Sequence, residues 1–175
     1  GSDRDTITSV AVSSDGSYIV GGYFESKTIE LENGITLNNK GSYEDGMIIK
    51  YSAEGEVEWA KGIGGRNDER ILTVAVSADG GYIVGGNLYS STIELDNGTT
   101  LTKKDNQDSR YSDGMVIKYN AEGEAEWGKV IGGDKDDYIT SVATSSDGGY
   151  IVGGYFKSST IELGNGITLT NKGYE

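Results

Sequence analysis

The chain of 175 residues contains no cysteine, no histidine and no proline. Without cysteine it forms no disulfide, and cysteine-bound zinc and thiolate catalysis are excluded. Without histidine it lacks the side chain most often used as a general base near neutral pH. No apolar run is long enough to span a bilayer and the sequence shows no signal peptide, so we expect no membrane insertion. We therefore expect a non-catalytic protein with no resident cofactor.

Positive charge is also scarce, because 15 Lys and Arg face 28 Asp and Glu, which gives a net charge of −13. Such a surface repels phosphate backbones, so nucleic acid is not an expected partner. The aromatic residues are mostly tyrosine, with 12 Tyr against 2 Phe and 2 Trp. The 28 glycines occur without the apolar stripe of an amphipathic helix, which predicts an all-β fold of short strands and tight turns.

Two motifs recur along the chain. The first reads DGSYIVGGY at 15–23, DGGYIVGGN at 79–87 and DGGYIVGGY at 147–155, and the second reads EGEVEWAKGIGG at 54–65 and EGEAEWGKVIGG at 122–133. We call the first motif with its preceding strand and following hairpin unit A, and the DGMIIKY run with the second motif unit B. The order A-B-A-B-A predicts one repeat domain over 1–175, with repeats at 1–65 and 66–133 and a partial repeat at 134–175.

Each unit predicts a pair of antiparallel strands. In the first unit A, Ile7–Ser13 and Tyr18–Phe24 flank a Ser-Asp-Gly turn, and in the first unit B the strands are Met47–Tyr51 and Val57–Ile63. Paired glycines follow each Tyr-Ile-Val run, and glycine inside a strand indicates close backbone approach. We interpret them as packing contacts, because a phosphate-binding loop would need a helix start and a Lys or Ser/Thr partner that do not follow.

The segment TIELENGITL at 28–37 predicts an additional hairpin in each repeat. A two-residue loop would divide its apolar side chains between the two faces. A three-residue loop pairs Leu31 with Ile35 and Ile29 with Leu37, and all four then share one face. We therefore predict a type I turn followed by a left-handed glycine, repeated at 96–98 and 164–166.

The run EAEWGKVIGGDKDDYITSVATSSDGGYIVGGYF at 124–156 resembles the Trp-x-Lys…Gly-Gly…Asp-Gly-Gly-Tyr-Ile-Val-x-Gly-Tyr repeats of bacterial exported proteins, and is similar to the seven-bladed β-propeller repeat family. The resemblance covers nearly all of units A and B, although the extra hairpin and the long period depart from the shorter typical blade. It implies propeller-like blades of four strands, in a bacterial protein that is secreted or held at the cell surface. It implies no shared chemistry, because such blades carry many functions.

A four-stranded module built from a unit B and a unit A needs neighbours over both faces. Two and a half modules are too few for a closed ring of four to eight blades, so we expect a partial or open array. The terminal sheet edges should be exposed, and further repeats or self-association through these edges would cover them.

Acidic residues precede each unit A, and the third copy is the richest, with Asp134, Asp136 and Asp137 in GGDKDDY. Three carboxylates in one loop make a candidate Ca²⁺ site. The first two copies do not keep this ligand set. The alternative interpretation is that Asp5, Glu69 and Asp137 accept backbone N–H bonds as caps of turns.

Tyr43 and Tyr111 lie in the loop that varies in length between repeats, and Tyr89 follows a strand whose last tyrosine is replaced. Tyrosine suits a recognition surface, so these three are the candidate partner-binding residues. The tyrosines that recur in every repeat are expected to pack between modules. The sequence thus favours a structural or adhesive scaffold for a protein or glycan partner. A carbohydrate-binding module that uses the loop tyrosines, and a fragment of an enzyme whose site lies elsewhere, are the alternatives.

Overall fold

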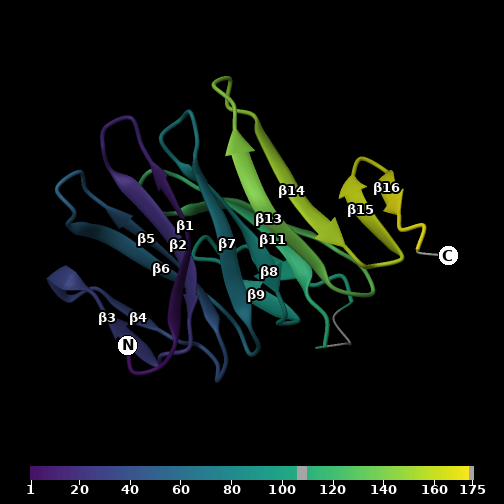
Figure 1. Ribbon diagram of the computed structural model, residues 1–175, viewed down its shortest axis with the longest axis horizontal. Coiled ribbons are helices and arrows are strands. Elements are labelled where there is room, and N and C mark those ends of the chain that lie inside the picture. The colour runs from purple at the N-terminus through teal and green to yellow at the C-terminus, as the bar shows by residue number, and fades with distance from the viewer. Residues whose placement is uncertain (106–109, 174–175) are drawn as a thin grey trace.

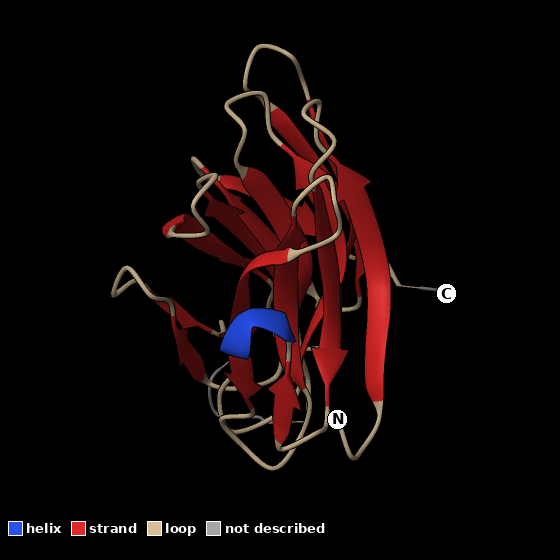
Figure 2. Ribbon diagram, turned by 90° about the vertical axis from the view of Figure 1, so that its left-hand side faces the viewer, coloured by secondary structure: helices blue, strands red, loops and turns tan. Residues whose placement is uncertain are grey.

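The computed structural model describes residues 1–105 and 110–173. Within them the chain forms sixteen β-strands and one short 3-10 turn, Glu32–Gly34 (Figures 1 and 2). No helix in the described ranges has the length and apolar character needed to cross a bilayer. The predicted all-β class is confirmed.

Two four-stranded antiparallel sheets follow one another along the chain, and a two-stranded sheet follows them. The first has the order β1-β2-β5-β6, the second β7-β8-β11-β12, and the third β13-β14. Their bounds are β1 Asp5–Val12, β2 Tyr18–Phe24, β5 Asp45–Tyr51, β6 Val57–Ile63, β7 Glu69–Val76, β8 Tyr82–Leu88, β11 Asp113–Tyr119, β12 Ala125–Ile131, β13 Asp137–Thr144 and β14 Tyr150–Phe156. The predicted tandem four-stranded antiparallel sheets are therefore present.

The assignment of units to sheets needs one correction. Each four-stranded sheet joins a unit A to the unit B that follows it, because β2 pairs with β5 and β8 pairs with β11. We had expected a unit B followed by a unit A. The connection from β2 to β5 runs through the extra hairpin, which folds beside the sheet and lets the chain return to the same edge.

The predicted hairpins form β3 Thr28–Glu30 with β4 Thr36–Asn38, β9 Thr92–Glu94 with β10 Thr100–Thr102, and β15 Thr160–Gly164 with β16 Ile167–Thr170. Ile29 pairs with Leu37, as predicted. The predicted turn occurs in the second hairpin, where Gly98 has φ 80° and donates to Leu95 O. It is wrong in the first hairpin, where Asn33 is left-handed as well as Gly34, with φ 60° and 75°. It is also wrong in the third, where Gly164 pairs with Ile167 across a shorter Asn165-Gly166 turn. Gly164, in place of an acidic residue, adopts φ 100°, which a side chain disfavours.

The sheets pack face to face through the paired glycines, as predicted. A Cβ on Gly21 would lie 2.6 Å from Val74 Cγ1 of the next sheet, and a Cβ on Gly22 would lie 2.1 Å from the carbonyl oxygen of Thr6. In the first two pairs, the first glycine therefore makes room for the next sheet. The second makes room for the neighbouring strand. The main hydrophobic core lies between and beside the first two sheets, and it includes Ile19, Ile48, Ile71, Val84, Leu88, Met115 and Ile117.

The two terminal sheets each leave one apolar face uncovered. On β1, Ile7, Val10 and Val12 are exposed, although the equivalent residues of β7 pack against the first sheet. On β14, Ile151 and Tyr155 are exposed. The stack of sheets therefore has two different ends, one formed by β1 and the other by β14 (Figure 1).

A candidate recognition surface at one end of the sheets

A repeated set of acid–serine contacts holds the end of the sheets at which β1, β7 and β13 begin. In each copy a carboxylate at the start of the strand accepts bonds from the backbone N–H and the hydroxyl of a serine in the loop after the next strand. The pairs are Asp5 with Ser26, Glu69 with Ser90, and Asp137 with Ser158. The carboxylates therefore accept backbone N–H bonds, as the capping interpretation predicts.

A second pair of buried carboxylates fixes the loops before unit B. Asp45 accepts the backbone N–H of Lys40 at 2.7 Å, and Asp113 accepts that of Lys104 at 2.6 Å. Burial raises the pKa of Asp113 to about 6 and that of Glu69 to about 7. Both side chains are almost fully buried, so they stabilise the loops and do not line an open site.

The side chains carried on this framework differ from copy to copy. We call Asp5, Glu69 and Asp137 the framework acids. The residue that follows each framework acid pairs across the sheet with the next-to-last residue of the second strand. These cross-strand pairs are Thr6 with Tyr23, Arg70 with Asn87, and Tyr138 with Tyr155. The repeats thus keep the same backbone arrangement at this end of the sheets but carry different side chains, of which Asn87 is fully buried.

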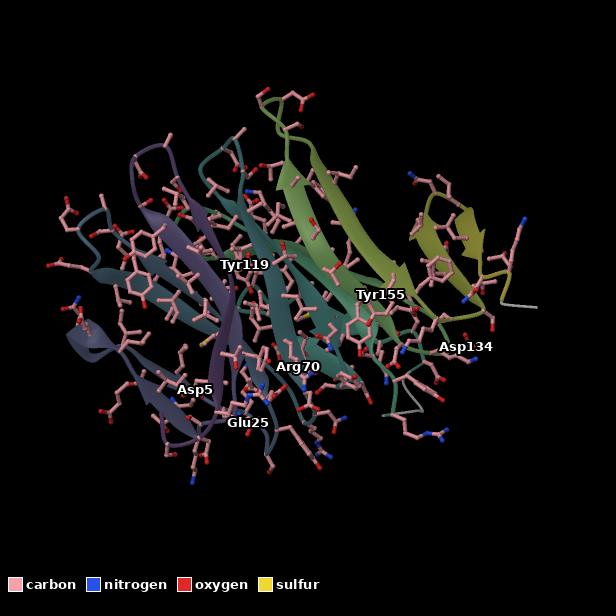
Figure 3. The ribbon with its side chains drawn as sticks, viewed as in Figure 1. Asp5, Glu25, Arg70, Tyr119, Asp134 and Tyr155 are labelled. Atoms are coloured by element: carbon pink, nitrogen blue, oxygen red, sulfur yellow. The ribbon has the colours of Figure 1, made fainter. Side chains whose placement is uncertain are left out.

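An open groove of about 540 Å³ lies beside Arg70, lined by Asp3, Glu25, Ser42, Tyr43, Glu44, Asp68 and Arg70. Figure 3 labels Glu25 and Arg70 of this lining. The Arg70 guanidinium forms an ion pair with Glu44, and its carbon lies 5.2 Å from the centre of the Tyr23 ring. Burial raises the pKa of Glu44 even though Arg70 opposes this shift. Tyr43 is 56% exposed at the groove. The groove therefore offers one cation, several carboxylates and an accessible aromatic ring.

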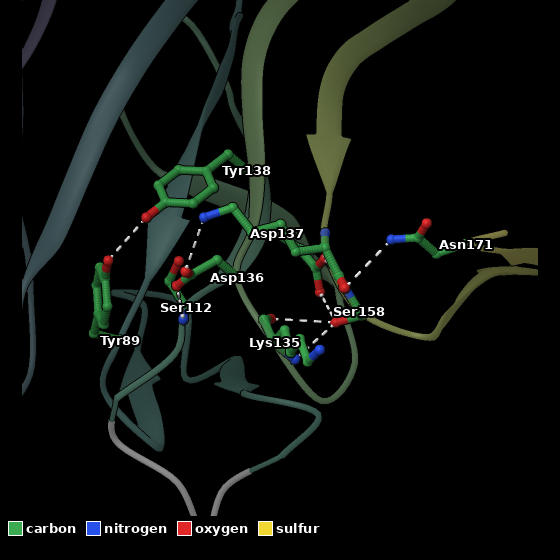
Figure 4. Close-up of polar contacts among 9 residues, drawn as sticks. Tyr89, Ser112, Lys135, Asp136, Asp137, Tyr138, Ser158 and Asn171 are labelled. Carbon is green, nitrogen blue, oxygen red and sulfur yellow. Dashed lines mark hydrogen bonds and ion pairs between the residues drawn. The ribbon is translucent and has the colours of Figure 1, made fainter. Parts of the chain in front are cut away.

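The equivalent junction in the next repeat is built from tyrosines instead. The hydroxyl groups of Tyr89 and Tyr138 lie 2.8 Å apart (Figure 4). The rings of Tyr138 and Tyr155 stack with centres 4.9 Å apart. Burial and the contact with Tyr138 raise the pKa of Tyr89. Tyr89 is therefore held by its neighbours, and Tyr155 is the more exposed member of the cluster.

Tyr111 occupies the variable loop of the second repeat. Its ring lies under the Arg110 guanidinium at 5.5 Å, and its carbonyl oxygen accepts a bond from Lys103 Nζ at 2.8 Å. The loop inserted between Leu101 and Asp113 includes residues 106–109, which lie outside the described ranges. The three candidate tyrosines therefore occupy separate surroundings along the same end of the sheets.

The three calcium candidates bind different partners. Asp134 accepts bonds from Ser159, Asp136 accepts the backbone N–H of Ser112 and pairs with Lys157, and Asp137 accepts bonds from Gly133, Lys157 and Ser158. In the described part of the chain no three carboxylates, or other metal-ligating side chains, converge on a point. These three carboxylates therefore hold loops in place through hydrogen bonds and an ion pair.

Sequence reasoning did not single out Arg70, Glu44 or Tyr138. Each differs from its counterpart in the other repeats, and Arg70 and Tyr138 directly follow a repeated acid. Aligning the three units and marking the positions that change would have found them. Their contacts with one another depend on loop conformation, which the alignment does not specify.

No known family model matches the chain. The regulatory protein FlaEY of Caulobacter vibrioides is 30% identical over 114 residues, which cover 65% of this chain and 12% of that protein. An uncharacterized WD repeat-containing protein, L264 of Acanthamoeba polyphaga mimivirus, is 26% identical over 143 residues, covering 71% of this chain and 10% of that protein. The chain thus spans about a tenth of the length of each relative.

Proposed function

We propose that the chain is a non-catalytic repeat segment of a bacterial secreted or cell-surface protein, and that it acts as an adhesive scaffold which presents the end carrying Tyr43 and Arg70 to a protein or glycan. The observation that carries the proposal is the contrast between a constant framework and a changing surface. Three acid–serine pairs recur, whereas the three cross-strand pairs above them differ in charge and size. A scaffold that presents groups to a partner has this property.

The comparisons support the scaffold part of this proposal. A similarity to a WD repeat-containing protein agrees with stacked four-stranded sheets, and such sheets serve many binding functions. The secreted or surface location comes from the sequence resemblance to bacterial exported repeats. The two matched proteins are far longer than the matched segments, which fits a role as one part of a larger protein.

A binding screen with the whole chain tests the proposal, using an oligosaccharide array and a display library of protein fragments. We expect saturable binding to a member of one set, weakened about tenfold or more by Tyr43→Ala, because an exposed aromatic anchor contributes strongly to recognition. The control is Ser146→Ala, in an exposed turn at the opposite end of β13, which should leave binding unchanged. Equal binding by the wild type and Tyr43→Ala would contradict the assignment of the groove.

A carbohydrate-binding module is the second candidate function, and the groove is the observation that favours it. Sugars bind to proteins through aromatic stacking and through hydrogen bonds to carboxylates and arginine, and the groove holds Tyr43, Glu25, Asp68 and Arg70. Binding to the oligosaccharide array that falls in both Tyr43→Ala and Tyr111→Ala would select this function. Binding to protein fragments alone would exclude it.

A further inference from the structure

The outer edge of β14 differs from the equivalent edges of β2 and β8. Strands β2 and β14 have the same sequence, YIVGGYF. In the first two sheets that edge pairs with β5 or β11 of unit B, whereas in the described part of the chain β14 pairs only with β13. We propose that the free edge of β14 is a binding site for a β-hairpin of the unit B type, with the sequence pattern Asp-Gly-Met-(Ile/Val)-Ile-Lys-Tyr in its inner strand.

The existing sheets define the register of the bound hairpin. In the second sheet Met115 lies opposite Gly86, Ile117 opposite Val84 and Tyr119 opposite Tyr82. The first sheet repeats this register, with Met47 opposite Gly22 and Ile49 opposite Val20. Transferred to β14, the same register places the methionine opposite Gly154, the isoleucine opposite Val152 and the tyrosine opposite Tyr150.

An apolar cavity of about 270 Å³ lies where these side chains would enter. It is lined mainly by Val152 and Phe156 of β14 and by Ile161, Leu163 and Leu169 of the β15–β16 hairpin. In the second sheet the equivalent space is filled, because Met115 and Ile117 pack with Leu95 and Leu101. Leu163 is 47% and Leu169 42% exposed, against 6% for Leu95 and 3% for Leu101. The cavity therefore matches the methionine and isoleucine of unit B.

Two further contacts would position the hairpin ends. The hairpin tyrosine would lie opposite Tyr150, as Tyr119 lies opposite Tyr82. Tyr150 is 40% exposed, and its ring lies 5.1 Å from that of Trp127, much as Tyr82 lies against Trp59. The hairpin aspartate should accept the backbone N–H of Lys172, which stands where Lys40 and Lys104 bind Asp45 and Asp113. The edge thus selects for shape, for register and for one carboxylate.

The inference does not rest on the proposed function, because it concerns the edge of β14 and not the groove at Tyr43.

The test uses the whole chain and a labelled synthetic peptide with the sequence of residues 112–133. We expect saturable 1:1 binding. The Met115→Asp peptide should bind at least about tenfold more weakly, because a carboxylate would enter an apolar cavity. The Glu122→Gln peptide, changed in its exposed turn, is the matched control and should bind like the unchanged peptide.

Cross-linking tests the register, and the chain offers no background because it contains no cysteine. The Ile117→Cys peptide should form a disulfide with the Val152→Cys chain under mild oxidation. It should not do so with the Ile151→Cys chain, because adjacent residues of a strand face opposite sides. Equal cross-linking to both positions would contradict the proposed register.

A fused hairpin provides an independent measurement, since covalent attachment raises the effective concentration. The chain followed by a flexible linker and a copy of residues 112–133 should melt several degrees higher than the chain alone. The fused copy with Met115→Asp should not. Failure of both the free peptide and the fused hairpin would overturn the proposal. The proposal would also be overturned if the chain forms a dimer through β14 and excess peptide does not dissociate that dimer. The edge of β14 would then be an interface between two copies of the chain.

Discussion

Strands β2 and β14 carry the same seven residues and end in different surroundings. Ile19 of β2 is fully buried between the first two sheets, whereas the equivalent Ile151 of β14 is 71% exposed. Phe24 is fully buried beneath the β3–β4 hairpin, and its equivalent Phe156 borders an open cavity. The burial of this motif is therefore a property of the neighbouring sheet and hairpin, and only its strand conformation is a property of the motif itself.

The largest predicted difference in stability between equivalent strands is at the isoleucine of the Tyr-Ile-Val run. Ile83 of β8 is buried against the third sheet, and Ile151 is its exposed counterpart in β14. We expect Ile83→Ala to lower the free energy of unfolding by about 4 kcal/mol, because a buried isoleucine leaves a cavity. Ile151→Ala should change it by less than about 0.5 kcal/mol. Urea unfolding of both variants measures the difference, and equal losses would show that β14 is covered in solution.

The second effect concerns the framework acid of the middle sheet. Burial raises the pKa of Glu69 from its ordinary 4.5 to about 7, so the folded state binds its proton more tightly than the unfolded state. The resulting stabilisation is fully present below pH 4.5 and is lost as the pH rises through about 7. Between pH 5 and pH 8 this residue should lower the free energy of unfolding by about 2–3 kcal/mol.

The Glu69→Gln variant should lose that part of the pH dependence, as measured by urea unfolding at pH 5, 6.5 and 8. The control is Glu94→Gln, which removes the same charge from an exposed strand position and should keep the wild-type slope. A Glu69→Gln variant with the wild-type slope would mean that Glu69 is ionised throughout this range.

The smallest predicted difference in stability is at the first glycine of the paired glycines. A Cβ on Gly85 would lie 2.7 Å from Ile139 Cγ2 and 3.1 Å from Val142 Cγ1. Among the described residues, a Cβ on Gly153 would meet only Ser141 Cβ, at 3.7 Å. We expect Gly85→Ala to cost about 2 kcal/mol through overpacking. Gly153→Ala should be neutral or stabilising by up to about 1 kcal/mol, because alanine restricts the unfolded chain. Thermal unfolding of the two variants gives the comparison, and similar shifts would argue against close packing at Gly85.

Much of this architecture could be predicted because repetition makes local patterns visible. The alternation of apolar residues defined the strands, and the need to place Ile29 and Leu37 on one face defined the hairpin register. The shorter third turn depends on Gly164, whose left-handed backbone no periodicity encodes. The pairing of β2 with β5 depends on how the intervening hairpin folds aside, and strand patterns alone do not contain that information.

The candidate site was less predictable, because its groups meet through loops. Tyr43 could be selected as an unrepeated aromatic residue in a variable loop. Its neighbour Arg70 lies on a strand of the next sheet, and the ion pair of Arg70 with Glu44 depends on the packing of two modules. Likewise, the hydrogen bond between Tyr89 and Tyr138 joins two repeats. Contacts of this kind depend on the relative placement of sheets, which residue spacing does not specify.

The uncovered faces of β1 and β14 also determine the symmetry of any assembly that these faces build. Inside the chain, the face that carries Ile71 and Val74 lies on the face that carries Gly21, and the exposed faces of β1 and β14 are the further copies of these two types. A contact that joins them is heterologous, so each added protomer presents the same two faces again. An assembly that grows through this contact has all its protomers pointing in the same direction, and it stops growing only when the rotation between protomers closes a ring. A twofold dimer cannot form through this contact, because it would join two identical faces.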